Sequence, residues 1–244
     1  MKINDVDAYR TATEVEVISS LIDLRGQRVL ELGCGGAWMT RLLARELAPA
    51  HIVATEVDRI QLEKNLSITD LPTVTFRYGG AESIADADET YDAVFMFKSL
   101  HHVPMDLMAQ ALGEIHRVLK PGGKAYFSEP VYWGPFNDLL RLVHDECEVR
   151  EAAFAALTHA VESGRFDLEA EVFFQVPDSY ESWEVFENRF LKVTHTALDI
   201  DSARYEAIRQ AFSRHLTPTG AYFLKPHRTD LLRKPHLPEQ GNPS

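Results

Sequence analysis

Short apolar runs that alternate with amphipathic segments constrain this chain more than any other feature. Between residues 28 and 130 the apolar runs have the length of strands, and they fall at residues 28–32, 51–56, 74–78, 91–97 and 124–128. The segments between them have helical periodicity, which predicts helices at residues 38–47, 59–66 and 105–119. Because strands that alternate with helices form a parallel sheet covered on both faces, the sequence predicts an α/β fold.

The pattern changes after residue 130. We interpret residues 131–188 as a helical cap inserted after the fifth strand, with a break at residues 176–180. Beyond the cap we expect two strands flanking a helix, at residues 190–196, 202–215 and 222–228 in that order. The sequence therefore predicts one domain over residues 1–233, with its core in residues 26–130 and 189–233. The tail at residues 234–244 is rich in proline and polar residues, so we expect it to be disordered.

The chain is acidic, with a formal net charge of −12 over 244 residues. Proteins that bind phosphate backbones use Lys and Arg, so we expect a small-molecule substrate and no nucleic-acid partner. No apolar run approaches the roughly 18 residues of a membrane span, and the first residues lack the apolar core of a signal peptide. Two cysteines, Cys34 and Cys147, have no metal-like spacing. We therefore expect a cytoplasmic location and no membrane partner, and a homodimer is left open.

The first predicted strand runs into a glycine-rich bend, VLELGCGGAWM, at residues 29–39. A strand, a tight glycine turn and a helix N-terminus together form a pocket for part of a small molecule. The dinucleotide frame G-x-G-x-x-G needs a third small residue where this chain has Trp38, and no P-loop Gly-Lys-Ser/Thr follows. The sequence therefore disfavours an NAD-dependent dehydrogenase.

A second frame, acidic-x-Gly-x-Gly-x-small, fits Glu31, Gly33, Gly35 and Ala37. With VATEVD, YGGAESI, YDAVFMFKSLHHV and EIHRVLKPGGKAYFSEP in this order, it resembles the class I S-adenosyl-L-methionine (SAM)-dependent methyltransferases. The resemblance is to their small-molecule, quinone-methyltransferase-like (type 11) subgroup. It covers about residues 28–130 and implies a Rossmann-like fold with a mostly parallel seven-stranded sheet. It also implies transfer of a methyl group from SAM to a small-molecule acceptor of specialised metabolism by in-line displacement, with S-adenosyl-L-homocysteine as product.

The resemblance assigns cofactor contacts to the ends of the first two strands. Glu31 is expected to receive the ammonium group of SAM, although it could instead cap the helix that follows. The bend itself is expected to contact the cofactor through Gly33, Cys34, Gly35 and Ala37.

The second strand ends at Glu56, which is expected to accept both ribose hydroxyls, with Val57 beside it. Asp58 is the rival carboxylate, but we expect it to be the N-cap of the next helix.

The adenine contact departs from the family pattern. Gly80, followed by the small Ala81 and the acidic Glu82, stands where the family often has an Asp that binds the adenine amino group. The backbone of Ala81 and the side chain of Glu82 are the expected replacements.

The end of the fourth strand supplies the remaining cofactor contacts and the catalytic candidates. Met96 and Phe97 are expected beside the methionyl portion, and Lys98 is unusual at its position in the family. His101 and His102 are candidates for a general base, because histidine titrates near neutrality. Packing or cofactor positioning is their alternative role.

Aromatic and polar residues after the fifth strand form a second group of candidates. The predicted substrate contacts are Tyr132, Trp133, Phe136, His144 and Arg228, with Glu146 in the same segment. Core packing is the alternative for the aromatic residues, and a surface ion pair is the alternative for Arg228. Adjacent residues of a helix face different directions, so residues 144–146 are not expected to share a metal, and we predict none.

Two further classes of function stay open. A protein with this fold could bind SAM without methylating, as a cyclase, a decarboxylase or a sensor, because fold does not determine function. A nucleic-acid methyltransferase is disfavoured, because FKSL replaces the Asn/Asp-Pro-Pro-aromatic motif of enzymes that methylate base amino groups.

Overall fold

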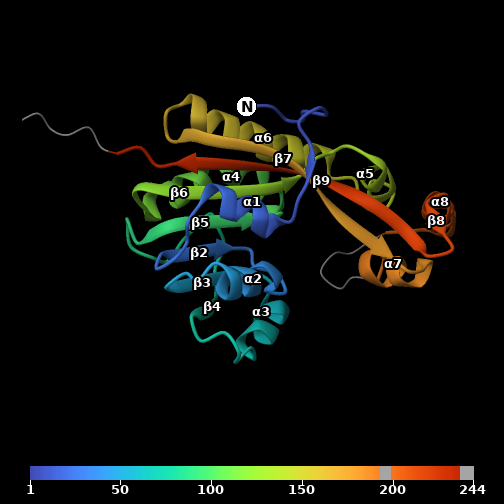
Figure 1. Cartoon of the computed structure of the whole chain (residues 1–244), viewed down its shortest axis with the longest axis horizontal. Helices are drawn as coiled ribbons and strands as arrows, with labels where there is room; N and C mark the ends of the chain where they lie inside the picture. Colours follow the sequence, from blue (N-terminus) through green and yellow to red (C-terminus); the bar gives the residue numbers. More distant parts are fainter. Residues whose placement is uncertain (193–198, 237–244) are drawn as a thin grey trace, which may run out of the picture.

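The computed structural model describes residues 1–192 and 199–236. Within them, nine strands form one sheet in the order β1-β7-β9-β6-β5-β2-β3-β4, with β8 paired to β9 (Figure 1). The strands are β1 (Arg10–Thr11), β2 (Arg28–Leu32), β3 (His51–Glu56), β4 (Val74–Tyr78), β5 (Tyr91–Phe97), β6 (Leu119–Pro130), β7 (Asp167–Tyr180), β8 (Leu216–Thr217) and β9 (Gly220–Arg233). Among the long strands, β9 is antiparallel to β6 and β7, and the other pairs are parallel. Apart from the two-residue β1 and β8, this is the predicted mostly parallel seven-stranded sheet.

The strand order reverses at β2, which pairs with β3 on one side and with β5 on the other. The connections after β2 and β5 therefore leave the sheet in opposite directions. In open α/β sheets a ligand binds outside the carboxyl ends of the strands at such a reversal. The topology thus places a binding site at the ends of β2 and β5.

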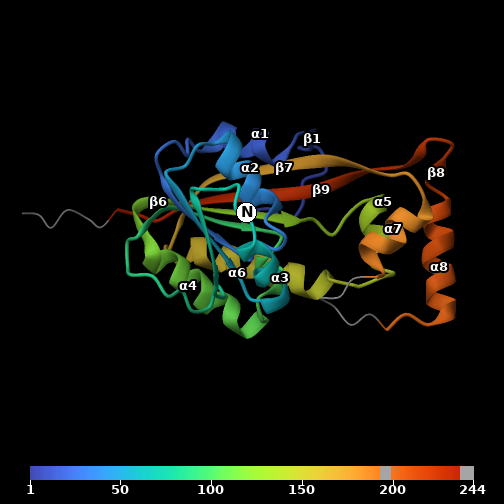
Figure 2. The same cartoon turned by 90° about the horizontal axis from the view of Figure 1, so that it is seen from below.

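Helices cover both faces of the sheet (Figure 2). Alternate residues of a strand point to opposite faces. Val29 packs in the cluster that contains α1 and α2, and Leu30 packs in the cluster that contains α4 and α6. The helices are α1 (Glu14–Leu21), α2 (Trp38–Glu46), α3 (Arg59–Leu66), α4 (Met108–Val118), α5 (Pro135–Leu140), α6 (Cys147–Glu162), α7 (Trp183–Phe190) and α8 (Ser202–Ser213), with the 3-10 turns η1 (Leu100–His102) and η2 (Met105–Leu107). The helices predicted within residues 38–119 are confirmed.

The prediction of helix across residues 167–175 is wrong, because these residues and the predicted break at residues 176–180 belong to β7. The segment DLEAEVFFQV alternates polar residues with apolar ones at positions 168, 170, 172, 174 and 176. That period of two is a strand signal, and the resulting strand packs Phe174 against the core of the sheet. The strand expected at 190–196 is also wrong at its start, since α7 ends at Phe190, and residues 193–198 lie outside the described residues.

The paired strands β7 and β9 continue past the edge of the other strands and carry α5, α7 and α8 at their far end (Figure 1). A third apolar cluster lies there, with fully buried Tyr180 and Phe186 packed against Phe136, Ile208 and Phe212. Helices α5 and α6 do follow the fifth long strand, β6, as the predicted insertion requires. The division into core and cap stays a prediction, and the tail from residue 237 lies outside the described residues. None of the helices in the described ranges combines the length and apolar character that crossing a bilayer requires.

Candidate functional site

The glycine bend begins where β2 ends, and its backbone is left-handed at three positions. Gly33, Gly35 and Ala37 have φ values of 71°, 51° and 59°. A Cβ on Gly33 would lie 2.9 Å from Cβ of Ser99, whereas a Cβ on Gly35 would meet nothing within 4 Å. Gly33 is therefore required by the neighbouring chain as well as by its backbone, and Gly35 leaves space open in front of α2.

That space belongs to a cavity of about 890 Å³ at the carboxyl ends of β2, β3, β4 and β5, which we call the larger cavity. Ten of the eleven residues predicted to bind the cofactor line it: Glu31, Gly33, Cys34, Gly35, Glu56, Val57, Ala81, Glu82, Met96 and Phe97. Ala37 does not line it, because it is fully buried at the N-cap position of α2. Burial also raises the pKa of the Cys34 thiol, so this group stays protonated.

Glu31 is a buried carboxylate without a full set of partners. Its side chain is 1% exposed, and its Oε2 atom accepts no hydrogen bond from any described residue. Burial raises the pKa of Glu31 to about 8, and the nearby charge of Glu56 adds to the shift. A cationic group in the larger cavity would remove this penalty by pairing with the carboxylate.

Glu56 holds the bend in place through backbone N–H groups. Its Oε2 accepts a hydrogen bond from Gly35 N at 2.7 Å, and its Oε1 accepts from Val57 N and Asp58 N, both at 2.9 Å. A carboxylate has about four lone-pair sites, so roughly one remains for a ligand hydroxyl. The Asp58 side chain accepts from Ile60 N at 2.9 Å, which confirms its predicted role as the N-cap of α3.

The two candidate histidines lie in η1, directly after β5. His101 is buried, and its Nδ1 pairs with Oε2 of Glu129, whose Oε1 accepts a hydrogen bond from Leu100 N at 2.9 Å. The rings of His101 and His102 lie 4.1 Å apart. Glu129 is not among the residues predicted above, although a carboxylate in the SEP segment at the end of the fifth strand is a usable signal.

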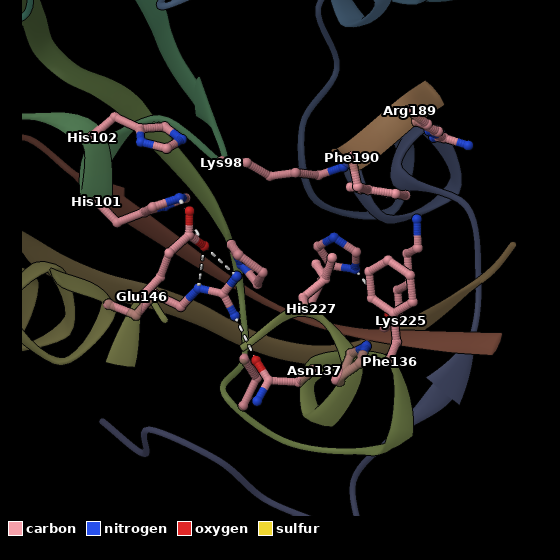
Figure 3. Close-up of a pocket in the computed structure, with 15 residues that line it drawn as sticks. Lys98, His101, His102, Phe136, Asn137, Glu146, Arg189, Phe190, Lys225 and His227 are labelled. Atoms are coloured by element: carbon pink, nitrogen blue, oxygen red, sulfur yellow. Dashed lines mark hydrogen bonds and ion pairs between the residues drawn. The ribbon is translucent and has the colours of Figure 1, made fainter. Parts of the chain in front are cut away.

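A second cavity, the smaller cavity, has a volume of about 270 Å³ and lies beside the first (Figure 3). It is lined by Lys98, His101, His102, Pro130, Val131, Phe136, Asn137, Leu140, Glu146, Arg150, Arg189, Phe190, Lys225, Pro226 and His227. Lys98 and His102 line both cavities, so the two spaces meet at these side chains. A molecule in one cavity therefore lies next to a molecule in the other.

Of the predicted substrate residues, Phe136 lines the smaller cavity, and four others line neither cavity. Trp133 stacks on Tyr9 with ring centroids 5.2 Å apart, Tyr132 lies beside Asp145, and His144 is exposed.

Arg228 is buried rather than on the surface. It donates to Asp230 at 2.8 Å and lies 4.3 Å from the ring centroid of Phe154. Its place in β9 points to a structural role.

Side chains that could ligate a metal also converge at the smaller cavity. Candidate ligand atoms of His101, His102 and Glu146 lie within 4.8 Å of one another. Arg150 already pairs with Glu146 at 2.6 Å, so a metal ion would compete with a guanidinium group for this carboxylate. Burial opposes ionisation of Glu146, but Arg150 and His101 hold its pKa below the usual value. That no metal binds here stays a prediction.

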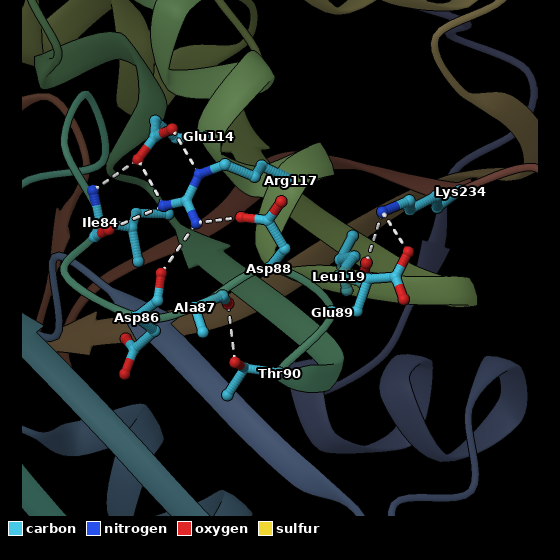
Figure 4. Close-up of polar contacts among 10 residues, drawn as sticks. All are labelled: Ile84, Asp86, Ala87, Asp88, Glu89, Thr90, Glu114, Arg117, Leu119 and Lys234. Atoms are coloured by element: carbon cyan, nitrogen blue, oxygen red, sulfur yellow. Dashed lines mark hydrogen bonds and ion pairs between the residues drawn. The ribbon is translucent and has the colours of Figure 1, made fainter.

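Arg117 of α4 is hydrogen-bonded to the loop that follows Ala81 and Glu82 (Figure 4). The guanidinium donates to the backbone oxygens of Ile84 and Asp86, both at 2.8 Å. These bonds join the loop between β4 and β5 to the body of the fold. Closer to the expected adenine-facing residues, Nε2 of Gln110 donates to the backbone oxygen of Glu82 at 2.8 Å.

The larger cavity is acidic. Its lining includes the carboxylates of Glu31, Glu56, Asp58 and Glu82, against Lys98 as the one Lys or Arg among the described lining residues. SAM carries two cationic groups, an ammonium and a sulfonium, and one carboxylate. The four carboxylates, the open space at Gly35 and the unpaired Oε2 of Glu31 therefore fit that cofactor.

The family model and the two relatives to which this chain is similar are all described as methyltransferases. A family model described as a methyltransferase domain matches residues 29–123. The chain is 33% identical over 121 residues to a phthiotriol/phenolphthiotriol dimycocerosates methyltransferase of Mycobacterium ulcerans, covering 50% of this chain and 41% of that protein. It is 32% identical over 116 residues to a ubiquinone biosynthesis O-methyltransferase of Xanthomonas oryzae, covering 47% of each. The chain thus spans less than half the length of these relatives.

The fold is shared with solved structures at low sequence identity. The YcgJ protein from Bacillus subtilis superposes with a TM-score of 0.62 at 16% identity, covering 91% of this chain and 97% of that one.

Proposed function

We propose that the protein is a class I small-molecule methyltransferase that transfers a methyl group from SAM to a small-molecule acceptor, because residues 29–123 match a methyltransferase domain model and the similar proteins are methyltransferases. The observation that carries this proposal is the unpaired, buried carboxylate of Glu31 beside the open glycine bend. A dinucleotide would bring phosphate charge into a cavity lined by four carboxylates, whereas SAM brings positive charge.

The lining residues divide the proposed cofactor contacts among them. Glu31 pairs with the ammonium group, and the free lone pair of Glu56 accepts from one ribose hydroxyl. Ala81 and Glu82 face the adenine, and Met96 begins the contact with the methionyl portion. A second ribose bond, as in the predicted bidentate contact, requires one of the three backbone N–H groups that donate to Glu56 to give up its own.

A general base at the junction of the cavities completes the proposal. Bound SAM supplies a methyl group on an activated sulfur for in-line displacement, so the protein must align the acceptor and take up any proton it loses. Because Nδ1 of His101 pairs with the Glu129 carboxylate, Nε2 is the ring nitrogen left to accept that proton. His102 lines both cavities and orients the acceptor.

Two experiments test the function. Isothermal titration calorimetry with SAM and with S-adenosyl-L-homocysteine should show binding that Glu31→Gln weakens, and a turnover assay should detect S-adenosyl-L-homocysteine release with an accepted small molecule. Binding without turnover would support the alternative of a cyclase, decarboxylase or sensor. Binding of neither compound would contradict the proposal. A cytoplasmic location, the absence of a nucleic-acid partner and a homodimer stay predictions.

A further inference from the structure

Lys98 is the cation at the junction of the two cavities. It directly follows β5 and has a φ of 53°, which is uncommon for a lysine and places its side chain across the opening (Figure 3). Its ammonium group forms no ion pair or hydrogen bond with another residue of the described ranges. The positive charge of Lys98 lowers the pKa of the Glu14 carboxyl, but burial has the larger effect and raises this pKa above its usual value.

Two more cations on the opposite wall share one carboxylate. Lys225 pairs with Asp178 and also donates to the hydroxyl of Tyr180 at 2.7 Å, while Nη1 of Arg189 lies 3.4 Å from the same Asp178 oxygen. Burial lowers the pKa of Lys225 to about 8, and the charges of Arg189 and Lys98 add to this effect. The single carboxylate of Asp178 therefore does not neutralise both Lys225 and Arg189, and this wall carries an excess of positive charge.

Among the other described residues that line the smaller cavity, Arg150 and Glu146 form an ion pair, and six residues are apolar. Arg150 is neutralised by Glu146 at 2.6 Å. The ring of Phe136 lies 4.1 Å from the ammonium of Lys225, and Phe190 and Leu140 continue the apolar surface. A ligand with one charged end and an apolar body would match this arrangement.

The two cavities thus have opposite electrostatic character in a chain whose net charge is −12. Resting on the proposed function of the larger cavity, we propose that the smaller cavity binds an acceptor that carries a carboxylate on an apolar body. Lys98, Lys225 and Arg189 bind the carboxylate, and Phe136 and Phe190 contact the apolar body. The anion also offsets the repulsion between Lys98 and the positive charge of the cofactor next to it.

Matched acids and amides test this inference without turnover. The probes are 3-phenylpropionate, cinnamate and hexanoate, each paired with its neutral amide, titrated by calorimetry into the full chain with saturating S-adenosyl-L-homocysteine and without it. We expect at least one acid to bind tenfold or more tightly than its amide. The preference should fall at high salt, because screening weakens charge pairs. If no acid exceeds its amide, the inference is wrong.

Single substitutions test which residues cause the preference for an acid over its amide. Arg189→Gln and Lys98→Met should each weaken binding of the preferred acid about tenfold and leave its amide unchanged, whereas Lys64→Met on the exposed surface of α3 should change neither. Retention of the full preference in both cavity variants would place the anion elsewhere and overturn the inference. Arg189 does not line the larger cavity, so its variant should bind S-adenosyl-L-homocysteine normally. If the unmodified chain does not bind S-adenosyl-L-homocysteine, the proposed function alone is contradicted. If the chain binds that compound but shows no preference for an acid over its amide, this inference alone is contradicted.

Discussion

Replacing Glu56 with alanine should have two separable effects, one on stability and one on cofactor binding. Three backbone N–H groups donate to this carboxylate at 2.7–2.9 Å. Hydrogen bonds to charged groups contribute about 1.5–3 kcal/mol each, but cavity water can replace part of them, so we expect the free energy of unfolding to fall by about 2–4 kcal/mol. Loss of the ribose contact should weaken SAM binding by roughly 1–3 kcal/mol, or about 5- to 150-fold in Kd.

Urea denaturation measures the first effect, and isothermal titration calorimetry with S-adenosyl-L-homocysteine well below the melting temperature measures the second. Asp58→Asn is the matched control, because asparagine caps a helix about as well as aspartate does. It should change stability and affinity by less than about 0.5 kcal/mol each. Unchanged affinity in Glu56→Ala, or a greater loss in Asp58→Asn, would show that the ribose carboxylate has been assigned wrongly.

Three further changes probe the bend, the ammonium site and the base. Gly33→Ala should lower the free energy of unfolding by about 1–3 kcal/mol in denaturant melts, because φ is 71° and the side chain of Ser99 blocks the new methyl group. In the control Gly36→Ala the new methyl group meets nothing within 4 Å, so the loss should be less than about 1 kcal/mol. Equal losses in the two variants would contradict the steric explanation. Burial raises the pKa of Glu31 from 4.5 to about 8 in the folded protein, so the free energy of unfolding should fall between pH 5 and 8 relative to that of Glu31→Gln. Over the same range the affinity for SAM should rise, with release of a proton that calorimetry detects. Identical pH profiles for the unmodified protein and Glu31→Gln would refute this. Glu129→Gln should lower kcat about 10–100-fold and shift the pH–rate profile while SAM affinity stays within twofold, and an unshifted profile would exclude a positioning role for Glu129.

The half of the fold that holds the larger cavity could be predicted because its signals are local. Each strand from residue 28 to residue 97 is a short segment rich in apolar residues, and the glycines fix the bend between β2 and α2. Glu31 and Glu56 follow from their places at strand ends, since the carboxyl ends of parallel strands meet at one edge. The frame does not show that Ala37 is fully buried behind the cavity lining, so its contact with the cofactor stays a prediction.

The smaller cavity depends on pairing between distant segments and could not be predicted. Lys225 and Asp178 meet only because β9 runs antiparallel to β7, with Val176 opposite Lys225 in the register. A helix at the position of β7 gives neither residue a reason to lie near Lys98. Tyr132 and His144 follow the fifth long strand in the sequence, but neither of them lines either cavity.

Binding of an adenosyl sulfonium in the larger cavity is the central claim, and parallel calorimetric titrations of the full chain with SAM, S-adenosyl-L-homocysteine and NADH test it most directly. We expect saturable 1:1 binding of SAM and S-adenosyl-L-homocysteine, weakened by Glu31→Gln, and no heat of binding with NADH. Saturable binding of NADH together with no binding of either adenosyl compound would contradict the account.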